Sequence, residues 1–204
     1  MSCTLLLIRH GQTDANAARP PVLQGQGDYP LNATGRSQAA ALAERLAARP
    51  IDAVYASPLS RAAETAAAIA TPRGLTVEPV ADLKEVDVGR WEGLSWDDVL
   101  ARDAATYGAV MKDAGDTPYP GGESYPQVAA RAVPALLRIA GRHGGGAVAV
   151  VAHRVVNRCV AATLMGLDLR RSKDLPQDNT ALNVLRGDGG RLRLVTLNDV
   201  SHLD

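Results

Sequence analysis

The stretch Cys3-Thr-Leu-Leu-Leu-Ile-Arg-His-Gly11 decides the fold. Its run from Cys3 to Ile8 is almost continuously apolar and closes on Gly11, a pattern typical of a strand buried on both faces of a parallel sheet. We therefore predict a central first strand whose carboxyl end carries Arg9 and His10.

Further apolar runs and helical patterns follow in alternation. The patterns predict strands at 53–56 and 147–152, helices at 34–48, from Ser57-Pro58 to 70 and at 155–165, and a closing hairpin of 181–185 and 192–197 around Asp188-Gly189-Gly190. Ser57 is interpreted as a helix N-cap and Pro58 as a first-turn proline. Strands that alternate with helices favour right-handed crossovers in a parallel sheet. The prediction is an α/β fold, a three-layer sandwich with a mostly parallel central sheet and helices on both faces.

The length and composition are those of one compact unit. The chain has 204 residues, 46% of them hydrophobic, and no repeat or low-complexity linker divides it. We expect a single domain over residues 1–204. Residues 102–126, rich in glycine and proline, are the least patterned stretch, and we interpret them as a lid or specificity segment.

Charge and cysteine content exclude several classes of function. Lys plus Arg number 22 and Asp plus Glu number 22, so no net charge favours nucleic acid or an anionic membrane surface. The two cysteines are too few for a disulfide framework, and no apolar run approaches the roughly 20 residues of a membrane helix. The start of the chain has no secretion-signal pattern. We expect a cytoplasmic protein without nucleic-acid or membrane partners.

Cationic side chains follow the three predicted parallel strands. The first strand ends in Arg9 and His10, the second leads to Arg61, and the third ends in His153. Ligands of open α/β sheets bind beyond the carboxyl ends of the strands, where these side chains would meet. The free N–H groups of the helix N-terminus near Arg61 also suit an anion. The sequence therefore predicts a site for a small dianion, with phosphate as the leading candidate.

Several blocks of sequence, taken in order, extend this argument over nearly the whole chain. They are LLLIRHGQTDAN (5–16), PLNATGRSQA (30–39), YASPLSRAAET (55–65), LKEVDVGRWEG (83–93), GGES (121–124) and VVAH (150–153). In these blocks and their order the chain resembles the histidine phosphatase superfamily, the phosphoglycerate mutase-like proteins. An Arg-His-Gly triplet alone is a weak signal, whereas the ordered set is specific.

The resemblance implies a phosphohistidine mechanism. His10 would be the nucleophile, and Arg9, Arg61 and His153 would hold the phosphoryl oxygens. The chemistry agrees, because a neutral imidazole is available near pH 7 and cations around it favour the neutral ring. His153 is expected to act in its protonated form, so that the two histidines differ in protonation state.

The proton donor is assigned by the resemblance alone. The family's acid after a Leu-x-Glu pattern corresponds to Glu85, which would protonate the leaving oxygen and then activate water. Asp82, Asp87 and Glu92 are rival acids in the same stretch. The residues by themselves do not separate Glu85 from Asp87.

Four further residues are expected to bind the substrate. Asn16 would donate a hydrogen bond to phosphate or ligand, and Gln24 and Gly25 match the family's second substrate loop. Arg154 stands where the family commonly has glycine. It either recognises a second anionic group of the substrate or points to solvent, and the sequence leaves both interpretations open.

The preferred function is a metal-independent phosphomonoesterase that hydrolyses a small phosphorylated metabolite without a cofactor. A 2,3-bisphosphoglycerate-dependent phosphoglycerate mutase is the alternative, although such relatives tend to carry a longer insertion. A non-catalytic phospho-ligand binding module is the alternative of another class. Cys3 and Arg9 have the C-x5-R spacing of cysteine-dependent phosphatases, but the residues between them predict an extended strand instead of a phosphate cradle. No metal-ligand spacing is found. The physiological substrate and the oligomeric state stay open.

Overall fold

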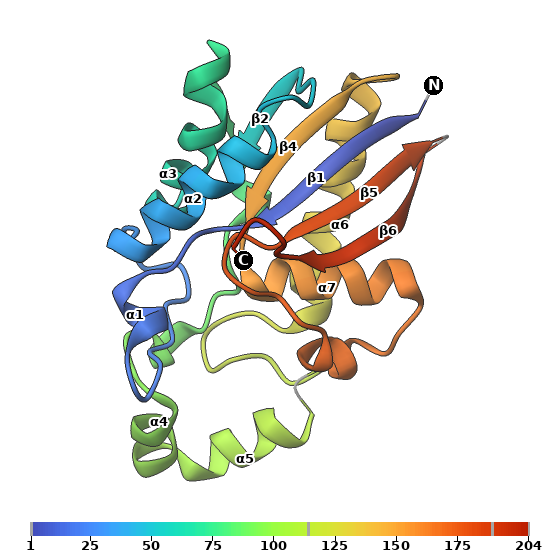
Figure 1. Cartoon of the computed structure of the whole chain (residues 1–204). Coiled ribbons are helices and arrows are strands. Elements are labelled where there is room, and N and C mark those ends of the chain that lie inside the picture. Colours follow the sequence, from blue (N-terminus) through green and yellow to red (C-terminus); the bar gives the residue numbers. More distant parts are fainter. Residues whose placement is uncertain (1, 114, 189, 204) are drawn as a thin grey trace.

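A mixed sheet lies at the centre of the computed structural model, which describes residues 2–113, 115–188 and 190–203 (Figure 1). Within these residues the sheet has six strands in the order β3-β2-β4-β1-β5-β6. The strands are β1 (Cys3–Arg9), β2 (Ala53–Ala56), β3 (Val77–Pro79), β4 (Ala147–Ala152), β5 (Leu182–Asp188) and β6 (Arg191–Asp199). The first strand of the chain therefore takes a central position, as its apolar run predicts.

The sheet combines a parallel part with an antiparallel edge. β1 pairs parallel with β4, β4 with β2, and β2 with β3, whereas β5 pairs antiparallel with β1 and β6. The predicted mostly parallel sheet and the closing hairpin are confirmed. Residue 189 of the predicted hairpin turn lies outside the described residues.

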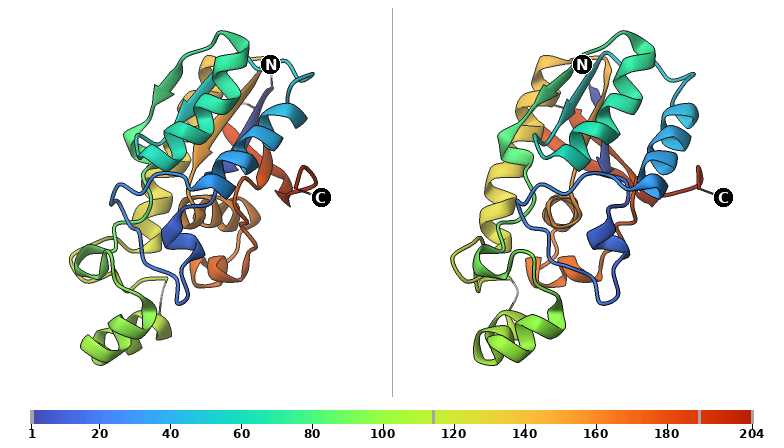
Figure 2. Two further views of the ribbon diagram at one scale, coloured as in Figure 1. Left: turned by 60° about the vertical axis from the view of Figure 1, so that its left-hand side comes forward. Right: turned by 90° about the vertical axis from the view of Figure 1, so that its left-hand side faces the viewer.

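Helices cover both faces of the sheet (Figure 2). They are α1 (Asp14–Ala17), α2 (Ala33–Arg45), α3 (Ser60–Ala70), α4 (Trp96–Arg102), α5 (Ala104–Lys112), α6 (Tyr125–Arg142) and α7 (Arg154–Met165), with short 3₁₀ helices η1 (Thr71–Arg73), η2 (Ala81–Leu83), η3 (Gly89–Trp91) and η4 (Leu169–Asp174). Leu6 and Ile8 of β1 pack with α2 and α3, while Leu5 and Leu7 belong to the core formed with α6 and α7. This alternation follows from the two-residue period of a strand. The predicted three-layer α/β sandwich is confirmed.

The predicted start of the helix after β2 is wrong. The Ser57 N–H donates to the Val151 carbonyl oxygen at 2.9 Å, which prolongs the pairing of β2 with β4 beyond the strand. Helix α3 therefore begins only at Ser60, and Leu59 occupies its N-cap without a capping side chain. The Ser57-Pro58 pattern predicts a helix start, but the backbone hydrogen bond to Val151, which is far away in sequence, keeps Ser57 in the extended pairing with β4.

The segment 102–126 is more regular than its composition suggests. Residues 104–112 form α5, which lies with α4 at one end of the molecule, below the sheet in Figure 1. Residue 114 lies outside the described residues. The sequence patterns do not predict the long helix α6, which carries Pro134 in its interior, where proline usually breaks a helix.

A close backbone approach holds the loop after β1. A Cβ atom at Gly11 would collide with the carbonyl oxygen of Gly35 in α2, and one at Gly35 would collide with the backbone of Gln12. Only glycine fits such contacts. The loop that carries His10 is thereby fixed against the first turn of α2.

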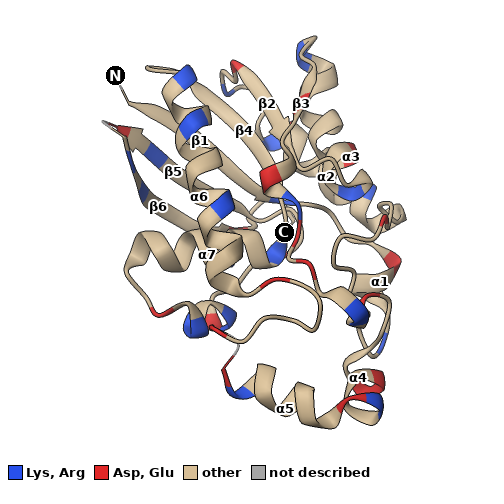
Figure 3. Ribbon diagram, turned by 180° about the vertical axis from the view of Figure 1, so that it is seen from behind, with Lys and Arg blue, Asp and Glu red and all other residues tan. Residues whose placement is uncertain are grey.

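Basic and acidic positions are interspersed along the elements seen from behind (Figure 3). None of the helices in the described part of the chain is both long and apolar enough to cross a lipid bilayer.

Candidate active site

The ends of β1 and β4 bring two histidines together. Arg9 lies opposite Ala152 in the parallel register, and the His10 N–H donates to the Ala152 carbonyl oxygen at 3.1 Å. His10 and His153 thus leave adjacent strands side by side, and their ring centroids are 5.1 Å apart. Residues separated by more than 140 positions form one pair because the strands are neighbours.

A cavity of about 620 Å³ opens at this edge of the sheet. Eight of the nine expected site residues line it: Arg9, His10, Asn16, Gln24, Gly25, Arg61, Glu85 and Arg154. His153, the ninth, is fully buried against the ring of His10. The structure therefore brings all nine residues to one place.

The rival acids lie elsewhere. Asp82 pairs with Arg138, Asp87 accepts a hydrogen bond from the Gly89 N–H, and Glu92 accepts from the Gln26 and Gly27 N–H groups. None of the three is among the described residues that line the cavity, whereas Glu85 is. Of the four acids, Glu85 is therefore the one that lies among the described cavity residues.

His10 is held as a neutral ring with one free nitrogen. Its Nδ1 lies 2.7 Å from the Gly11 carbonyl oxygen, which can only accept, so Nδ1 carries a proton, and in the neutral ring Nε2 then keeps its lone pair. Burial, and then the charges of Arg9 and Arg61, hold the pKa of His10 well below its ordinary value. The ring can therefore act as a nucleophile without first losing a proton.

His153 differs from the expectation of a protonated ring. Burial, followed by the charge of Arg61, holds the pKa of His153 well below its ordinary value, so the neutral form is favoured for both rings. Neither ring nitrogen of His153 has a hydrogen-bond partner among the described residues. A buried environment that already holds cationic side chains disfavours one more positive charge.

The two arginines are buried and tied to backbone carbonyl groups. Arg9 donates to the Gln177 carbonyl oxygen at 2.6 Å, and burial lowers its pKa to about 9. Arg61, only 1% exposed, donates to the Gly25 and Gly27 carbonyl oxygens, both at 2.8 Å. Arg61 therefore fixes the predicted substrate loop while lying beside the histidines.

Glu85 is oriented by two backbone N–H groups. Its Oε1 accepts from the Val86 N–H at 2.8 Å, and its Oε2 accepts from the Val155 N–H at 3.2 Å. Val155 is the second residue of α7, whose first turn has free N–H groups. The carboxyl group thus bridges its own loop and the helix that follows His153.

Arg154 and Arg158 lie one helical turn apart at the start of α7, and both line the cavity. Arg158 is half-buried and donates to the Leu175 carbonyl oxygen at 2.7 Å. Arg154 is exposed and makes no hydrogen bond or ion pair with the described residues. Arg154 thus lies at the cavity with its side chain exposed, which is compatible with both interpretations.

Sequence reasoning missed several residues of the cavity wall. They include Tyr119, Tyr125, Arg158, Gln177 and Asn179. Tyr119 and Tyr125 belong to the segment 102–126, whose lack of pattern was the only signal that it contributes to the site. Gln177 and Asn179 follow η4, and nothing in their local sequence indicates chemistry.

The described residues show no geometry suited to a cysteine nucleophile or to a metal site. Cys3 is fully buried at the opposite end of β1 from Arg9, and burial raises the pKa of its thiol. Burial also raises the pKa of Cys159 to about 12. In the part of the chain that the structure describes, no three His, Cys, Asp or Glu side chains are grouped to hold a metal ion.

The lowered pKa values predict acid-sensitive stability. In the unfolded chain, His10 and His153 titrate near pH ~6.5, whereas the folded rings bind protons only at lower pH. Below that pH the unfolded state binds more protons, so the free energy of unfolding falls as the pH decreases, by up to about 1.4 kcal/mol per pH unit for each ring. Denaturant titrations should show a shallower loss on acidification for His153→Gln than for the wild type. An equal dependence of the free energy of unfolding on pH in both proteins would contradict a contribution from His153.

The sequence model of the histidine phosphatase superfamily (branch 1) matches residues 5–200. The chain belongs to this superfamily. The resemblance inferred from the ordered blocks is thereby confirmed.

Several proteins that are similar to this histidine phosphatase chain are named as phosphatases. A metal-independent phosphoserine phosphatase of Arabidopsis thaliana is 38% identical over 98% of this chain and 82% of its own length. Phosphoserine phosphatase 1 of Hydrogenobacter thermophilus is 31% identical over 98% and 93%. The structure of Bacillus stearothermophilus YhfR superposes with a TM-score of 0.91 at 32% identity, over 99% of this chain and all of that one. The two relatives that are named phosphoserine phosphatases support a phosphatase activity.

Proposed function

We propose that the protein is a metal-independent phosphomonoesterase that hydrolyses a small phosphorylated metabolite through a phosphohistidine on His10, with Glu85 as general acid and base. One observation carries the proposal. A buried neutral imidazole with a free Nε2 is flanked by Arg9 and Arg61 in the same cavity as the Glu85 carboxyl group. This arrangement supports the proposal, because the residues proposed as nucleophile, anion-binding cations and proton donor lie at one cavity.

The first step transfers the phosphoryl group. The lone pair of His10 Nε2 forms a bond to phosphorus while the ester P–O bond breaks, and its electron pair stays on the leaving oxygen. Glu85, entering this step protonated, gives its proton to that oxygen, and the alcohol departs. Arg9, Arg61 and His153 bind the phosphoryl oxygens, and the dianion raises the proton affinity of His153.

The second step releases phosphate. A water molecule attacks the phosphorus of phosphohistidine and gives a proton to the Glu85 carboxylate. The N–P bond breaks, and its electron pair returns to Nε2 of His10. Inorganic phosphate leaves, and the enzyme regains a neutral His10 and a protonated Glu85.

The substrate carries a second anionic group in this proposal. Arg154 lines the cavity without a partner among the described residues, in addition to the arginines that serve the phosphoryl group. Two relatives are named phosphoserine phosphatases, and phosphoserine has a carboxylate beside its phosphate. Asn16, Gln24 and Gly25, which line the same cavity, would make the further contacts with the substrate.

Substitution of Arg154 by glutamine should reduce recognition of a carboxylate. For phosphoserine, kcat/KM is expected to fall about 10- to 100-fold, the effect of one charge-assisted hydrogen bond. For 4-nitrophenyl phosphate, which lacks a carboxylate, it should change by less than about 3-fold. A parallel fall for both substrates would contradict a role in carboxylate recognition.

The experiment for the proposed function follows phosphate release and isomerisation together in the presence of EDTA. The substrates are an aryl phosphate, a panel of small phosphomonoesters including phosphoserine, and 3-phosphoglycerate with catalytic 2,3-bisphosphoglycerate. Release without added metal, together with acid-labile phosphate trapped on His10, is the expected result. Isomerisation without release would assign a mutase, and binding of phosphoesters without turnover would assign a binding module.

A further inference from the structure

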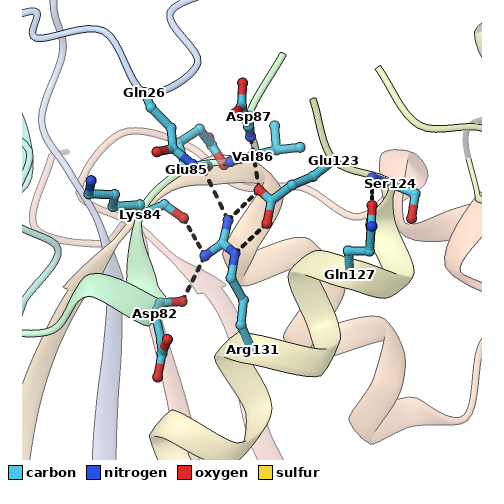
Figure 4. Close-up of polar contacts among 10 residues, drawn as sticks. All are labelled: Gln26, Asp82, Lys84, Glu85, Val86, Asp87, Glu123, Ser124, Gln127 and Arg131. Atoms are coloured by element: carbon cyan, nitrogen blue, oxygen red, sulfur yellow. Dashed lines mark hydrogen bonds and ion pairs between the residues drawn. The ribbon is translucent and has the colours of Figure 1, made fainter. Parts of the chain in front are cut away.

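An arginine of α6, Arg131, binds the backbone of the loop that carries Glu85 (Figure 4). Arg131 donates from one terminal nitrogen to the carbonyl oxygens of Asp82 and Lys84, both at 2.7 Å. Its other terminal nitrogen donates to the carbonyl oxygen of Glu85 itself at 3.1 Å. The guanidinium group therefore fixes three backbone positions around the proposed acid.

The remaining donors of this guanidinium bind Glu123. Arg131 Nε lies 2.7 Å from Glu123 Oε1, and the terminal nitrogen that serves Glu85 lies 2.8 Å from Oε2. The same Oε2 accepts from the Asp87 N–H at 2.9 Å, and the Glu123 N–H donates to the Asp87 carbonyl oxygen at 2.9 Å. All five N–H groups of Arg131 are used, and Glu123 holds the other side of the loop.

This pair differs from the surface ion pairs of the molecule. The side chains of Arg131 and Glu123 are 19% and 22% exposed, against 58% and 44% for Arg138 and Asp82. Although burial acts to raise it, the hydrogen bonds from Arg131 and from the Asp87 N–H lower the pKa of Glu123. The pair is a partly buried, fully hydrogen-bonded unit, which is sensitive to the loss of either member.

We propose that Arg131 and Glu123 are positioning residues for proton transfer by Glu85. They do not belong to the described residues that line the cavity, so they act through the loop. By fixing the backbone on both sides of Glu85, they keep its carboxyl group in reach of the Val155 N–H and of the leaving oxygen. The inference rests on the proposed function of Glu85 and adds the residues that hold it in place.

A comparison of leaving groups tests this role. kcat/KM reports the steps up to departure of the alcohol, so it depends on Glu85 only when the leaving oxygen needs a proton. For an alkyl phosphate such as phosphoserine, Arg131→Gln, Glu123→Gln and Glu85→Gln should each lower kcat/KM by about 100-fold or more. For 2,4-dinitrophenyl phosphate, whose phenolate leaves without a proton, the loss should stay below about 5-fold.

A matched control lies on the same helix. Arg138 is seven residues after Arg131 in α6 and binds the side chain of Asp82 from outside. Arg138→Gln should leave both substrates unaffected. Inhibition by inorganic phosphate should be unchanged in all variants, which shows that the cationic site is intact. If Arg131→Gln does not fold, Arg131→Lys and Glu123→Gln provide the test, through the same ratio of kcat/KM for the alkyl phosphate to kcat/KM for 2,4-dinitrophenyl phosphate.

Three outcomes are distinguishable. A selective loss for the alkyl phosphate in Glu85→Gln and in the pair supports the positioning role. A selective loss in Glu85→Gln together with equal losses for both substrates in the pair variants overturns positioning and leaves the proposed function standing. No selective loss in Glu85→Gln overturns proton transfer by Glu85, and the positioning role with it.

Discussion

Replacement of His10 by alanine is expected to lower turnover of every phosphomonoester by at least about 10⁴-fold, because the nucleophile that forms the covalent intermediate is lost. Binding of inorganic phosphate should weaken by less than about 10-fold, since Arg9 and Arg61 stay in place. Steady-state phosphate release and calorimetric phosphate titration measure the two effects. The variant should also fail to retain acid-labile phosphate.

His143 provides the control for this experiment. Its Nε2 lies 2.8 Å from the Tyr55 hydroxyl oxygen, and His143 is not among the described residues that line the cavity. His143→Ala should retain turnover and the phosphohistidine. Turnover by His10→Ala above about one per cent of the wild type would assign the nucleophile to another residue.

Replacement of Arg61 by alanine is expected to lower kcat by about 10³-fold. The guanidinium group stabilises charge on the phosphoryl oxygens in the transition state, a contribution comparable to that of other arginines in phosphoryl transfer. A second effect follows from electrostatics. Because the charge of Arg61 is one cause of the lowered pKa of His10, the acid limb of the kcat/KM profile should move to higher pH in the variant.

Arg36 is a suitable control for charge alone. It is an exposed arginine of α2 that pairs with Glu64 of α3 at 3.2 Å. Arg36→Ala should change neither kcat nor the pH profile. If Arg61→Ala retained kcat within about 10-fold, Arg61 would serve only to hold the substrate loop through Gly25 and Gly27.

The strands and the cationic edge could be predicted because buried parallel strands carry continuous apolar runs. The residues that end those runs, such as His10 and His153, then fall at one edge of the sheet by topology alone. The assignment of Glu85 came from the family resemblance. Only the folded loop shows that Glu85 lies at the cavity and Asp87 does not, because both carboxylates lie in the same stretch of sequence.

The remaining features depend on contacts that no local pattern encodes. Ser57 and Pro58 carry a helix-start signal, but a hydrogen bond to Val151, more than 90 residues away, prolongs the strand instead. Arg131 has the sequence signature of an ordinary helix-surface arginine. Its role at the Glu85 loop follows from the packing of α6 beside that loop, which the spacing of residues does not reveal.

The central position of β1 also determines when the site can form during synthesis. This strand pairs with β4 and β5, so residues 3–9 cannot form their sheet hydrogen bonds until residues 147–152 and 182–188 have been synthesised. Such a topology has high contact order, and its non-local pairings form late. A nascent chain that has exposed only its first 140 residues carries His10, Arg61 and Glu85 but lacks the strand that gathers them. The site can therefore assemble only after residues 147–152 and 182–188 have been synthesised.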